Sequence, residues 1–431
     1  MVVKATLFGC GYASLGDSYQ RSKPATHPKA PKSASPARRL GTHDSLLNAR
    51  HFNGVYYRRD ADRRSSIGRQ RVRRIHFFPK GGSWLASSRY RVFHLAEELE
   101  KIARPCKLHS PPRILRRYLT QQRGRRLTLT ELAMFRSREV ARSIVSFLHI
   151  PRGEIIFAQR SVYSRSFATM LLRAHRSRPL IFDIDDAVQE GQRELTRQLV
   201  CKADMVIVGS HALELFAHSQ GSRRVYFFPT SIPLSNYSLR PNPLTGHRPT
   251  IGWMGTGPEH LENIKILRLP LIELAKKFEF LFLFVGSLDD PALMELLAAF
   301  EGVRMEIIPN LDWANPSAVL HVLHRFDIGL MPLTDTPRHR AKCAFKAIES
   351  MACAIPVVVS GIGENVHLVE SGQDGFPAST EAEWIDRLSI LLGDEKLRRR
   401  MGAHARTTIE KHYDIQKNAG AFNNYLALEI G

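Results

Sequence analysis

The chain has 431 residues, of which 43% are hydrophobic and 24% are charged, as in a globular protein. Its length predicts two domains of roughly 150 to 200 residues each, and no stretch approaches the run of about 20 apolar residues that a membrane-spanning helix requires. The net charge of +21 favours anionic partners, whether phosphorylated substrates, lipid surfaces or nucleic acid.

The excess positive charge belongs largely to the amino-terminal segment. Residues 1–74 contain sixteen Lys or Arg but only four Asp or Glu, so they account for +12 of the total. The stretch "SKPATHPKAPKSASPARR" has no apolar periodicity and cannot form a packed core. Residues 1–72 are therefore predicted to be a disordered basic extension, with order beginning near Arg73.

The cysteines are five in number and scattered: Cys10, Cys106, Cys201, Cys343 and Cys353. No CxxC pair exists, so they indicate neither a zinc site nor a disulfide framework. A reducing cytoplasm is the simplest setting. No metal and no cofactor are expected.

From residue 73 onward, short β-prone runs alternate with helical patterns. In the first half, strands are expected in "RRIHFFP", "EIIFAQR", "PLIFDIDD", "ADMVIVGS" and "RVYFFPT". A helix is expected over "SSRYRVFHLAEELEKI", capped by Ser87 or Ser88, because its apolar residues recur at helical spacing. The Arg-rich segment 107–127 fits this pattern poorly and is predicted as helix and loop. The alternation itself predicts crossover connections and a parallel sheet.

The Pro-rich segment 231–250 is the best candidate for a linker, after which the pattern restarts. Strands are expected in "TIGWMG", "FEFLFLFVG", "VRMEIIP", "DIGLMPL", "PVVVSG" and near Phe376, with helices over 258–277, 315–325 and 343–353. Thr380 and Glu383 form a capping box for a further helix that Gly393 ends, and Asp394 can cap the next one.

These elements predict two doubly wound parallel-sheet domains facing a cleft. The first, Rossmann-like domain is expected over 73–240 and the second over 241–410. A C-terminal helix over 411–431 would be available to pack back on the first domain. Ligands of open parallel sheets bind outside the carboxyl ends of the strands, so the residues that follow each strand are the candidates for a site.

Several such residues have the chemistry to bind phosphate or hydroxyl groups. Gly82 permits close approach of the backbone to a phosphate, and the planar fork of Arg89 matches phosphate oxygens. After later strands, Gly255 and Thr256 offer backbone N–H groups, as does Gly257. The isolated histidines, by contrast, are expected at the surface: His211, His321 and His324.

Three carboxylates, Asp183, Asp185 and Asp186, follow or end the strand "PLIFDIDD". They are predicted to position acceptor or sugar hydroxyls, although one of them could instead cap the next helix. The spacing is similar to the DxD motif of the GT-A glycosyltransferase fold, whose carboxylates hold a divalent ion. The surrounding α/β pattern argues against that interpretation, so no metal ligand is assigned.

The segment "KCAFKAIESMACAIPVVVS" followed by "GENVHLVESGQDGF" resembles the donor-binding part of group 1 (family 4) retaining glycosyltransferases of the GT-B fold. "SSRYRVFHLAEEL", "PLIFDIDDA" and "ADMVIVGS" ahead of "YFFPTSI" are similar to the amino-terminal half of a subgroup of that family. The resemblance covers roughly 73–415. It implies a nucleotide-sugar donor held mainly by the second domain, an acceptor held mainly by the first, and no essential metal.

The resemblance also implies roles for particular residues. Lys342 and Lys346 lie near the start of the 343–353 helix, whose free N–H groups and positive dipole end suit a diphosphate. Glu349 occupies the family position whose carboxylate binds the ribose hydroxyls. The turn after "PVVVS" adds Gly363, Glu364 and Asn365 to the expected donor-binding residues.

One position departs from the family pattern. The family often has two glutamates, E-x7-E, and the first of them, which approaches the sugar, is replaced here by Ala341. Family variants with K-C-x-x-K in this place dispense with that glutamate, which makes the change a subgroup trait. Alternatively, it marks a protein that has lost activity.

The predicted function is therefore transfer of a sugar from a nucleotide-sugar to an acceptor hydroxyl with retention, in polysaccharide, lipid or other glycoconjugate synthesis. In the family, the leaving phosphate is thought to help deprotonate the acceptor. The alternatives are a degenerate GT-B protein that binds a nucleotide-sugar or a partner without turnover, and a sugar-nucleotide epimerase on the same fold. No specific nucleic acid is expected, because no recognised binding module is present. A cytoplasmic location is expected, with peripheral contact to an anionic membrane surface as an extension of it.

Overall fold

A computed structural model describes residues 72–109, 128–160, 165–174, 177–187, 193–240 and 248–430. The predicted basic extension lies outside the described residues apart from Val72, as does most of the Arg-rich segment 107–127. The described chain forms two six-stranded sheets in which every pair of neighbouring strands is parallel.

The first sheet has the strand order β2-β1-β3-β4-β5-β6. Its strands are β1 (Ile75–Phe78), β2 (Cys106–Leu108), β3 (Ile155–Gln159), β4 (Leu180–Ile184), β5 (Met205–Val208) and β6 (Val225–Phe227). The inner strands β1, β3, β4 and β5 are buried along their whole length. Continuous apolar runs suit strands covered on both faces, which explains why the sequence shows no strict alternation there.

The second sheet repeats this design with the order β12-β11-β10-β7-β8-β9. Its strands are β7 (Thr250–Met254), β8 (Leu281–Val285), β9 (Met305–Ile308), β10 (Ile328–Met331), β11 (Val357–Ser360) and β12 (Gly375–Ala378). In both sheets the order reverses next to the first strand of the domain. A topological switch point of this kind is where ligands of such sheets bind.

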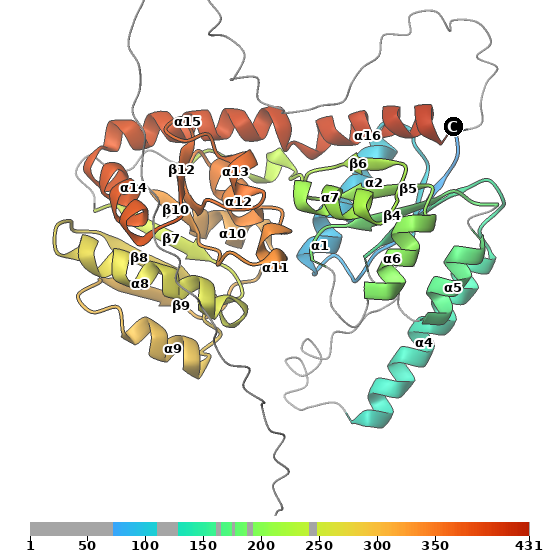
Figure 1. Ribbon diagram of the computed structural model, residues 1–431, viewed down its shortest axis with the longest axis horizontal. Coiled ribbons are helices and arrows are strands. Elements are labelled where there is room, and N and C mark those ends of the chain that lie inside the picture. Colours follow the sequence, from blue (N-terminus) through green and yellow to red (C-terminus); the bar gives the residue numbers. More distant parts are fainter. Residues whose placement is uncertain are drawn as a thin grey trace, which may run out of the picture. The chain divides into compact units, whose positions relative to one another are not determined.

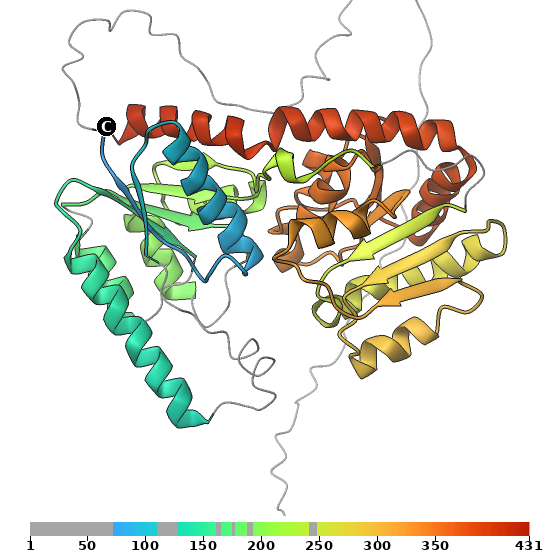
Figure 2. The same cartoon turned by 180° about the vertical axis from the view of Figure 1, so that it is seen from behind.

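Helices cover both faces of each sheet (Figures 1 and 2). In the first domain they are α1 (Ala86–Ser88), α2 (His94–Lys101), α4 (Leu129–Leu148), α5 (Arg165–Ala174), α6 (Arg193–Lys202) and α7 (His211–Ser219). In the second they are α8 (Leu261–Ala275), α9 (Pro291–Ala298), α10 (Pro316–Leu323), α11 (Pro337–Arg340), α12 (Phe345–Ala352), α13 (Asn365–Leu368) and α14 (Glu381–Gly393). The expected α/β class with two Rossmann-like domains is confirmed.

Two long helices, α15 (Glu395–His412) and α16 (Ile415–Glu429), end the chain and appear red in Figure 1. Ala405 and Ile409 of α15 belong to an apolar core of the second domain. Phe422 and Leu426 of α16 instead join a core of the first domain, packed with residues of β1, β3 and α2. The last helix therefore returns to the domain that contains the first described strand.

Local signals placed several helix ends correctly. Thr380 accepts from the Glu383 N–H, and both halves of the predicted capping box are present. Asp394 accepts from Leu397 N–H at the start of α15, as expected. Caps of this kind depend on residues only three positions apart, so sequence alone can identify them.

The predicted cap at Ser87 or Ser88 is wrong. The helical run begins at Ala86 without a side-chain cap, and a π-helical turn, Arg89–Phe93, leads into α2. Ser88 Oγ instead accepts from Gly81 N–H (3.0 Å) and donates to Gln159 Oε1 (2.9 Å). This serine ties the turn after β1 to the end of β3, a tertiary contact that competes with capping.

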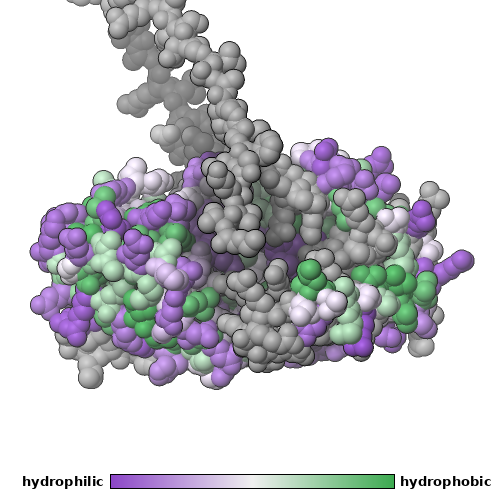
Figure 3. Space-filling model, turned by 90° about the horizontal axis from the view of Figure 1, so that it is seen from below, coloured by the Kyte–Doolittle hydropathy of each residue, from purple (hydrophilic) through white to green (hydrophobic). Residues whose placement is uncertain are grey.

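The described surface is mixed in character. In the view from below, hydrophilic and hydrophobic side chains are interspersed over the described part of the face (Figure 3). A search of the described helices found none with both the length and the apolar character needed to cross a membrane.

Candidate active site

A cavity of about 170 Å³ lies between the two domains at the carboxyl ends of their strands. The first domain contributes residues that follow β1, β3, β4 and β6: Ser87, Tyr90, Arg160, Asp185, Asp186 and Thr230. The second contributes Met331 at the end of β10 and the segment Lys342 to Lys346 at the start of α12. This is the place where the doubly wound topology predicts a ligand.

The three candidate carboxylates of the first domain have different environments. Asp183 is fully buried within β4 and accepts from Arg91 Nε at 2.9 Å, while Arg91 also donates to the Phe228 carbonyl. Asp186 accepts from Arg160 Nη2 at 2.9 Å and from the Ala187 N–H. Both carboxylates thus have cationic partners, and Asp183 does not line the cavity.

Asp185 differs from its neighbours because it lines the cavity with an unsatisfied atom. It is 6% exposed, and its Oδ1 lies 3.6 Å from Arg160 Nη1, too far for a hydrogen bond. Of the four buried side-chain polar atoms without a hydrogen-bond partner in the described part, Asp185 Oδ1 and Ser87 Oγ both belong to cavity-lining residues. Native proteins rarely leave such atoms without a hydrogen-bond partner, so these two oxygens are candidates for contact with a ligand or with water.

The start of α12 brings positive charge to the opposite wall. Ala344, with φ of 56°, turns the chain into the helix, and Lys342 and Lys346 lie on either side of it in the cavity wall. Lys346 Nζ lies 3.1 Å from His260 Nε2 and 5.7 Å from the centre of the Trp253 ring. The site therefore gathers cationic groups at the positive end of a helix dipole.

Burial and neighbouring positive charge both lower the pKa values of Lys346 and His260. Burial, reinforced by Lys342, lowers the pKa of Lys346 to about 8. Burial, reinforced by Lys346 and then Lys342, lowers the pKa of His260 to about 2. Since each positive charge disfavours the next, an anion bound here would relieve their repulsion.

Gly255 and Gly257 were predicted to bind phosphate through their backbone. The Gly255 N–H donates to the Val285 carbonyl at 3.0 Å and the Gly257 N–H to the Gly286 carbonyl at 2.8 Å, so neither is available. A side chain at Gly255 would place its Cβ 2.5 Å from Lys346 Cε. In this structure, Gly255 therefore makes room for the lysine, and Thr256 lies in the turn beside it.

Glu349 lies one turn further along α12 and is 7% exposed. It accepts from the Tyr237 hydroxyl at 2.9 Å, and Tyr237 in turn lies 2.9 Å from the Tyr90 hydroxyl. Burial raises the pKa of Glu349 to about 7, against the Tyr237 hydrogen bond and the charge of Arg89. Through Tyr90, which lines the cavity, this chain joins Glu349 to the first domain.

Gly363, Glu364 and Asn365 lie together between β11 and α13, but none of them lines this cavity. Glu364 is 3% exposed and accepts from His211 N and Nδ1, both at 3.0 Å, which joins the second domain to α7 of the first. His211, expected at the surface, has a side chain that is 34% exposed and also forms this interdomain contact. Asn365 donates to the Ser360 carbonyl at 2.9 Å.

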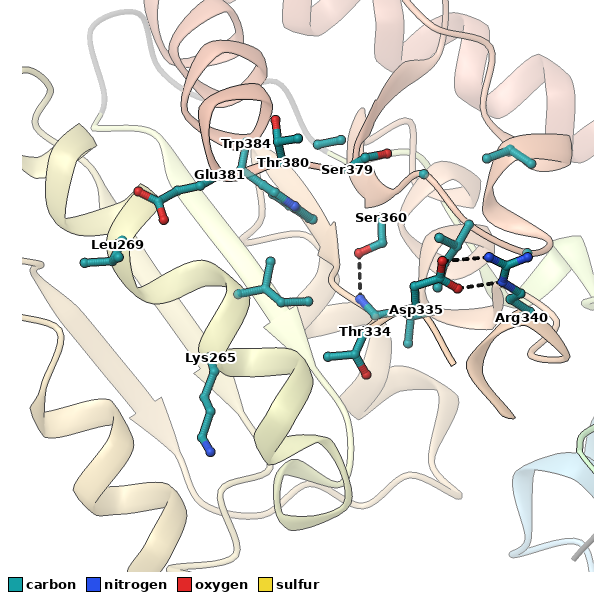
Figure 4. A pocket seen from close by; sticks show the side chains of 17 residues that line it. Lys265, Leu269, Thr334, Asp335, Arg340, Ser360, Ser379, Thr380, Glu381 and Trp384 are labelled. Atoms are coloured by element: carbon teal, nitrogen blue, oxygen red, sulfur yellow. Dashed lines mark hydrogen bonds and ion pairs between the residues drawn. The ribbon is translucent and has the colours of Figure 1, made fainter. Parts of the chain in front are cut away.

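A larger cavity of about 610 Å³ lies in the second domain at the ends of β10, β11 and β12 (Figure 4). Arg340 and Asp335 form a two-point ion pair at one side, and Thr380, Glu381 and buried Trp384 lie at the other. Gly363 is the one predicted site residue in its wall. Its φ of +55° and the Arg340 carbonyl, 2.6 Å from where a Cβ would be, both require glycine.

Of the remaining predicted residues, Arg89 and Gly82 lie outside the cavity wall. Arg89 donates to the Ser83 carbonyl at 3.4 Å, and a Cβ on Gly82 would collide with the Trp84 ring. Sequence reasoning did not identify Tyr90, Tyr237, His260 or Arg160, because each acquires its role through partners distant in the chain.

The two parallel sheets, with a cavity between their carboxyl ends, define the GT-B fold, and solved structures agree. A sucrose-phosphate synthase from Thermosynechococcus elongatus matches with a TM-score of 0.62 at 15% identity, over 83% of this chain and 98% of its own. A glycosyltransferase from Rickettsia africae matches with a TM-score of 0.60 at 13% identity, over 84% of this chain and 99% of its own. HepE of Anabaena, solved with UDP and glucose, matches with a TM-score of 0.56 at 15% identity, over 83% of this chain and 100% of its own. At these identities the likeness establishes the fold, and the GT-B prediction is confirmed.

A family model matches the second domain. Residues 248–394 match the family model described as "Glycosyl transferases group 1". Together with the fold, this match confirms the resemblance to group 1 GT-B glycosyltransferases. The matched region includes Lys342, Lys346 and Glu349. A search of curated protein sequences found no match.

Proposed function

We propose that the protein is a glycosyltransferase that moves a sugar from a nucleotide-sugar to an acceptor hydroxyl. The observation that carries the proposal is the cavity between the domains, where two lysines near the start of α12 face a carboxylate with a buried oxygen that lacks a hydrogen-bond partner. A nucleotide-sugar has a group that matches each of them: an anionic diphosphate for the lysines and sugar hydroxyl groups for the carboxylate. The group 1 match over 248–394 and the HepE structures with UDP and UDP-glucose support this ligand class.

The diphosphate is proposed to bind at the amino terminus of α12. Lys342 and Lys346 supply charge there, and the helix dipole adds to it. During transfer, negative charge builds up on the leaving diphosphate. Fixed cations in a buried site stabilise that charge more than water does, because they need no reorganisation. We propose that these cations make a metal ion unnecessary. The described residues contain no group of three His, Cys, Asp or Glu suited to one.

The nucleoside is proposed to bind through Glu349. Its carboxylate already accepts from Tyr237, and the other lone pairs can accept from the ribose hydroxyls. Only the ionised form offers all of them. With its pKa raised to about 7, Glu349 binds ribose best above neutral pH.

The transferred sugar or the acceptor is proposed to lie against Asp185 and Ser87. Both have buried oxygen atoms that lack a hydrogen-bond partner among the described residues, and a hydroxyl group would satisfy both. We propose that transfer proceeds with retention and that the leaving phosphate takes the proton of the acceptor hydroxyl. The resemblance to retaining enzymes supports this. The anomeric configuration of the product, read by proton NMR, tests it directly.

Binding without turnover is the second candidate function. Ala341, at the position of the first family glutamate, is 5% exposed and packs in the apolar core of the first domain. Its carbonyl accepts from Ser210 Oγ at 3.1 Å. No carboxylate can approach the sugar from there. A protein that binds a donor but releases no nucleoside diphosphate with any acceptor would fit this alternative.

The setting of the reaction is also a proposal. The net charge of +21 suits peripheral contact with an anionic membrane surface, and the expected acceptors are saccharides or lipids of glycoconjugate synthesis in the cytoplasm. Co-sedimentation with anionic but not neutral vesicles, weakened by salt, tests this contact.

The decisive experiment is the thermal midpoint of the full chain with UDP-, GDP-, ADP- and dTDP-sugars. A ligand that binds the native state raises the midpoint with concentration. We expect one nucleotide to do so, with the shift lost in Lys346→Met and kept in Lys396→Met, an exposed lysine outside the cavity. Absence of any shift in the folded protein would contradict the proposal.

A further inference from the structure

We propose that His260 stabilises the uncharged amine form of Lys346 in the donor-free protein, and that Lys346 in this form takes up a proton when a diphosphate binds. The uncharged form prevails above the pKa of Lys346, which is about 8. This inference rests on the proposed function for its ligand, but its structural basis is independent of it. It assigns a role in donor binding to His260, a residue without a signal in the sequence.

The argument begins at Thr334, whose N–H can only donate. It donates to Asn263 Oδ1 at 2.8 Å, and this fixes the orientation of the Asn263 amide. The Thr334 hydroxyl donates to the same oxygen at 3.2 Å. The other end of the amide, Nδ2, is therefore the group that lies 2.9 Å from His260 Nδ1.

The orientation of Asn263 determines the tautomer of His260. Since Asn263 Nδ2 donates, His260 Nδ1 must accept and carries no hydrogen. A neutral imidazole then has its hydrogen on Nε2. A second proton on the ring would place two donors against each other at Nδ1, which agrees with the strongly lowered pKa of His260.

The tautomer of His260 in turn determines the state of Lys346. His260 Nε2 and Lys346 Nζ are 3.1 Å apart, and Nε2 carries the hydrogen. A hydrogen bond between them needs a lone pair on Nζ. An ammonium group has none, because all its hydrogens are donors. The contact is therefore satisfied by the uncharged amine.

Burial and the charge of Lys342 also favour the uncharged form of Lys346. Burial and Lys342 lower its pKa, while Glu349, Cys343 and Glu259 act more weakly to raise it. Around His260, further positive charge comes from His339 and Arg338 on α11. A diphosphate would reverse this balance, since its negative charge favours the ammonium form.

Binding would then change the partners of both side chains. A proton from solvent adds to Lys346 Nζ, and the new ammonium turns its hydrogens to the diphosphate. His260 Nε2–H loses its acceptor on the amine and becomes a second donor to the same anion. The ligand class is a diphosphate esterified at both ends, as in nucleotide-sugars.

Calorimetry can count the proton. The nucleotide-sugar that binds among UDP-glucose, GDP-mannose and ADP-glucose is titrated in buffers of different ionisation enthalpy. Its bridged diphosphate has no phosphomonoester ionisation near pH 6 to confuse the count. With the pKa of Lys346 rising from about 8 towards its usual value, uptake should be about half a proton at pH 8 and nearly one at pH 9.

Two variants make the count specific. Lys346→Arg keeps a cation that does not titrate, so uptake should vanish while weaker binding remains. His260→Gln offers a carbonyl that accepts from an ammonium group, so uptake at pH 8 should fall well below half a proton. Tight binding by the wild type with no uptake at either pH would overturn the proposal, as would unchanged uptake in Lys346→Arg.

A second measurement needs no donor and separates the two proposals. Nitrogen-15 NMR of histidine-labelled protein, assigned with His260→Gln, should show the Nε2–H tautomer of His260. The Nδ1–H tautomer would refute the inference even if a donor binds. If the protein shows the expected tautomer but binds none of the three nucleotide-sugars, the hydrogen bonds from Asn263 through His260 to Lys346 are supported and the proposed function is contradicted.

Discussion

Replacing Glu349 by glutamine should stabilise the donor-free protein at alkaline pH while weakening donor binding. The carboxylate is 7% exposed and has one hydrogen-bond donor, Tyr237, so its ionised form is poorly compensated. Glutamine has nearly the same shape and can accept the same hydrogen bond without carrying charge. The substitution therefore isolates the cost of burying the charge.

The size of the effect follows from the pKa of Glu349, which burial raises from 4.5 to about 7. A rise of 2.5 in pKa corresponds to about 3 kcal/mol. Between pH 4.5 and 7 the native state holds a proton that the unfolded state has released, so wild-type stability falls as pH rises through this window. Glu349→Gln lacks this loss. Its advantage over the wild type should be small below pH 4.5 and approach about 3 kcal/mol at pH 8.

Urea unfolding of both proteins at pH 4.5, 6 and 8 measures this difference. Glu301→Gln, a substitution at an exposed carboxylate, serves as the matched control and should show no pH-dependent advantage. The same preparations should show a smaller thermal shift with donor for Glu349→Gln than for the wild type. A stability difference that does not change with pH would refute the reasoning about the buried charge.

Three further outcomes are expected. Asp183→Asn leaves the buried Arg91 without its counter-charge and should cost about 3–5 kcal/mol of stability, measured by urea unfolding. Asp185→Asn should leave the thermal midpoint nearly unchanged but lower kcat by about 10- to 100-fold, which is the rate factor that corresponds to one hydrogen bond to a charged group. A loss of folding stability of the same free energy would argue for a structural role of Asp185 instead. Because Lys342 and Lys346 are proposed to bind the diphosphate, EDTA should leave the transfer rate unchanged, and a rate restored only by Mg²⁺ or Mn²⁺ would contradict this.

The fold was largely predictable because its signals are local. Buried parallel strands appear as short apolar runs, and the helices between them carry their own caps, as at Thr380 and Asp394. The repeated alternation then restricts the topology to parallel sheets. Ser88 shows the limit of such signals. Its contacts with Gly81 and Gln159 bridge separate strand ends, and nothing in the flanking residues distinguishes them from a cap.

The site was only partly predictable, since its chemistry depends on distant pairs. Lys342, Lys346 and Glu349 were assigned because one short segment that resembles the family's donor-binding part contains all three. His260 and Lys346 are 86 residues apart, and Tyr90 and Tyr237 are 147 residues apart. No periodicity connects such positions, because contacts between elements follow from the packing of the whole domain.

The three carboxylates at β4 show how the structure distinguishes side chains that stabilise the fold from a side chain that is available to a ligand. All three lie within four residues, and their chemical type is the same. Asp183 lies inside the strand, where Arg91 donates to it, and Asp186 accepts from Arg160 and a backbone N–H. Asp185, just past the strand end, keeps a buried oxygen without a donor. Folding tends to satisfy buried polar groups, so the atom left unsatisfied beside a cavity is the one to assign to a ligand.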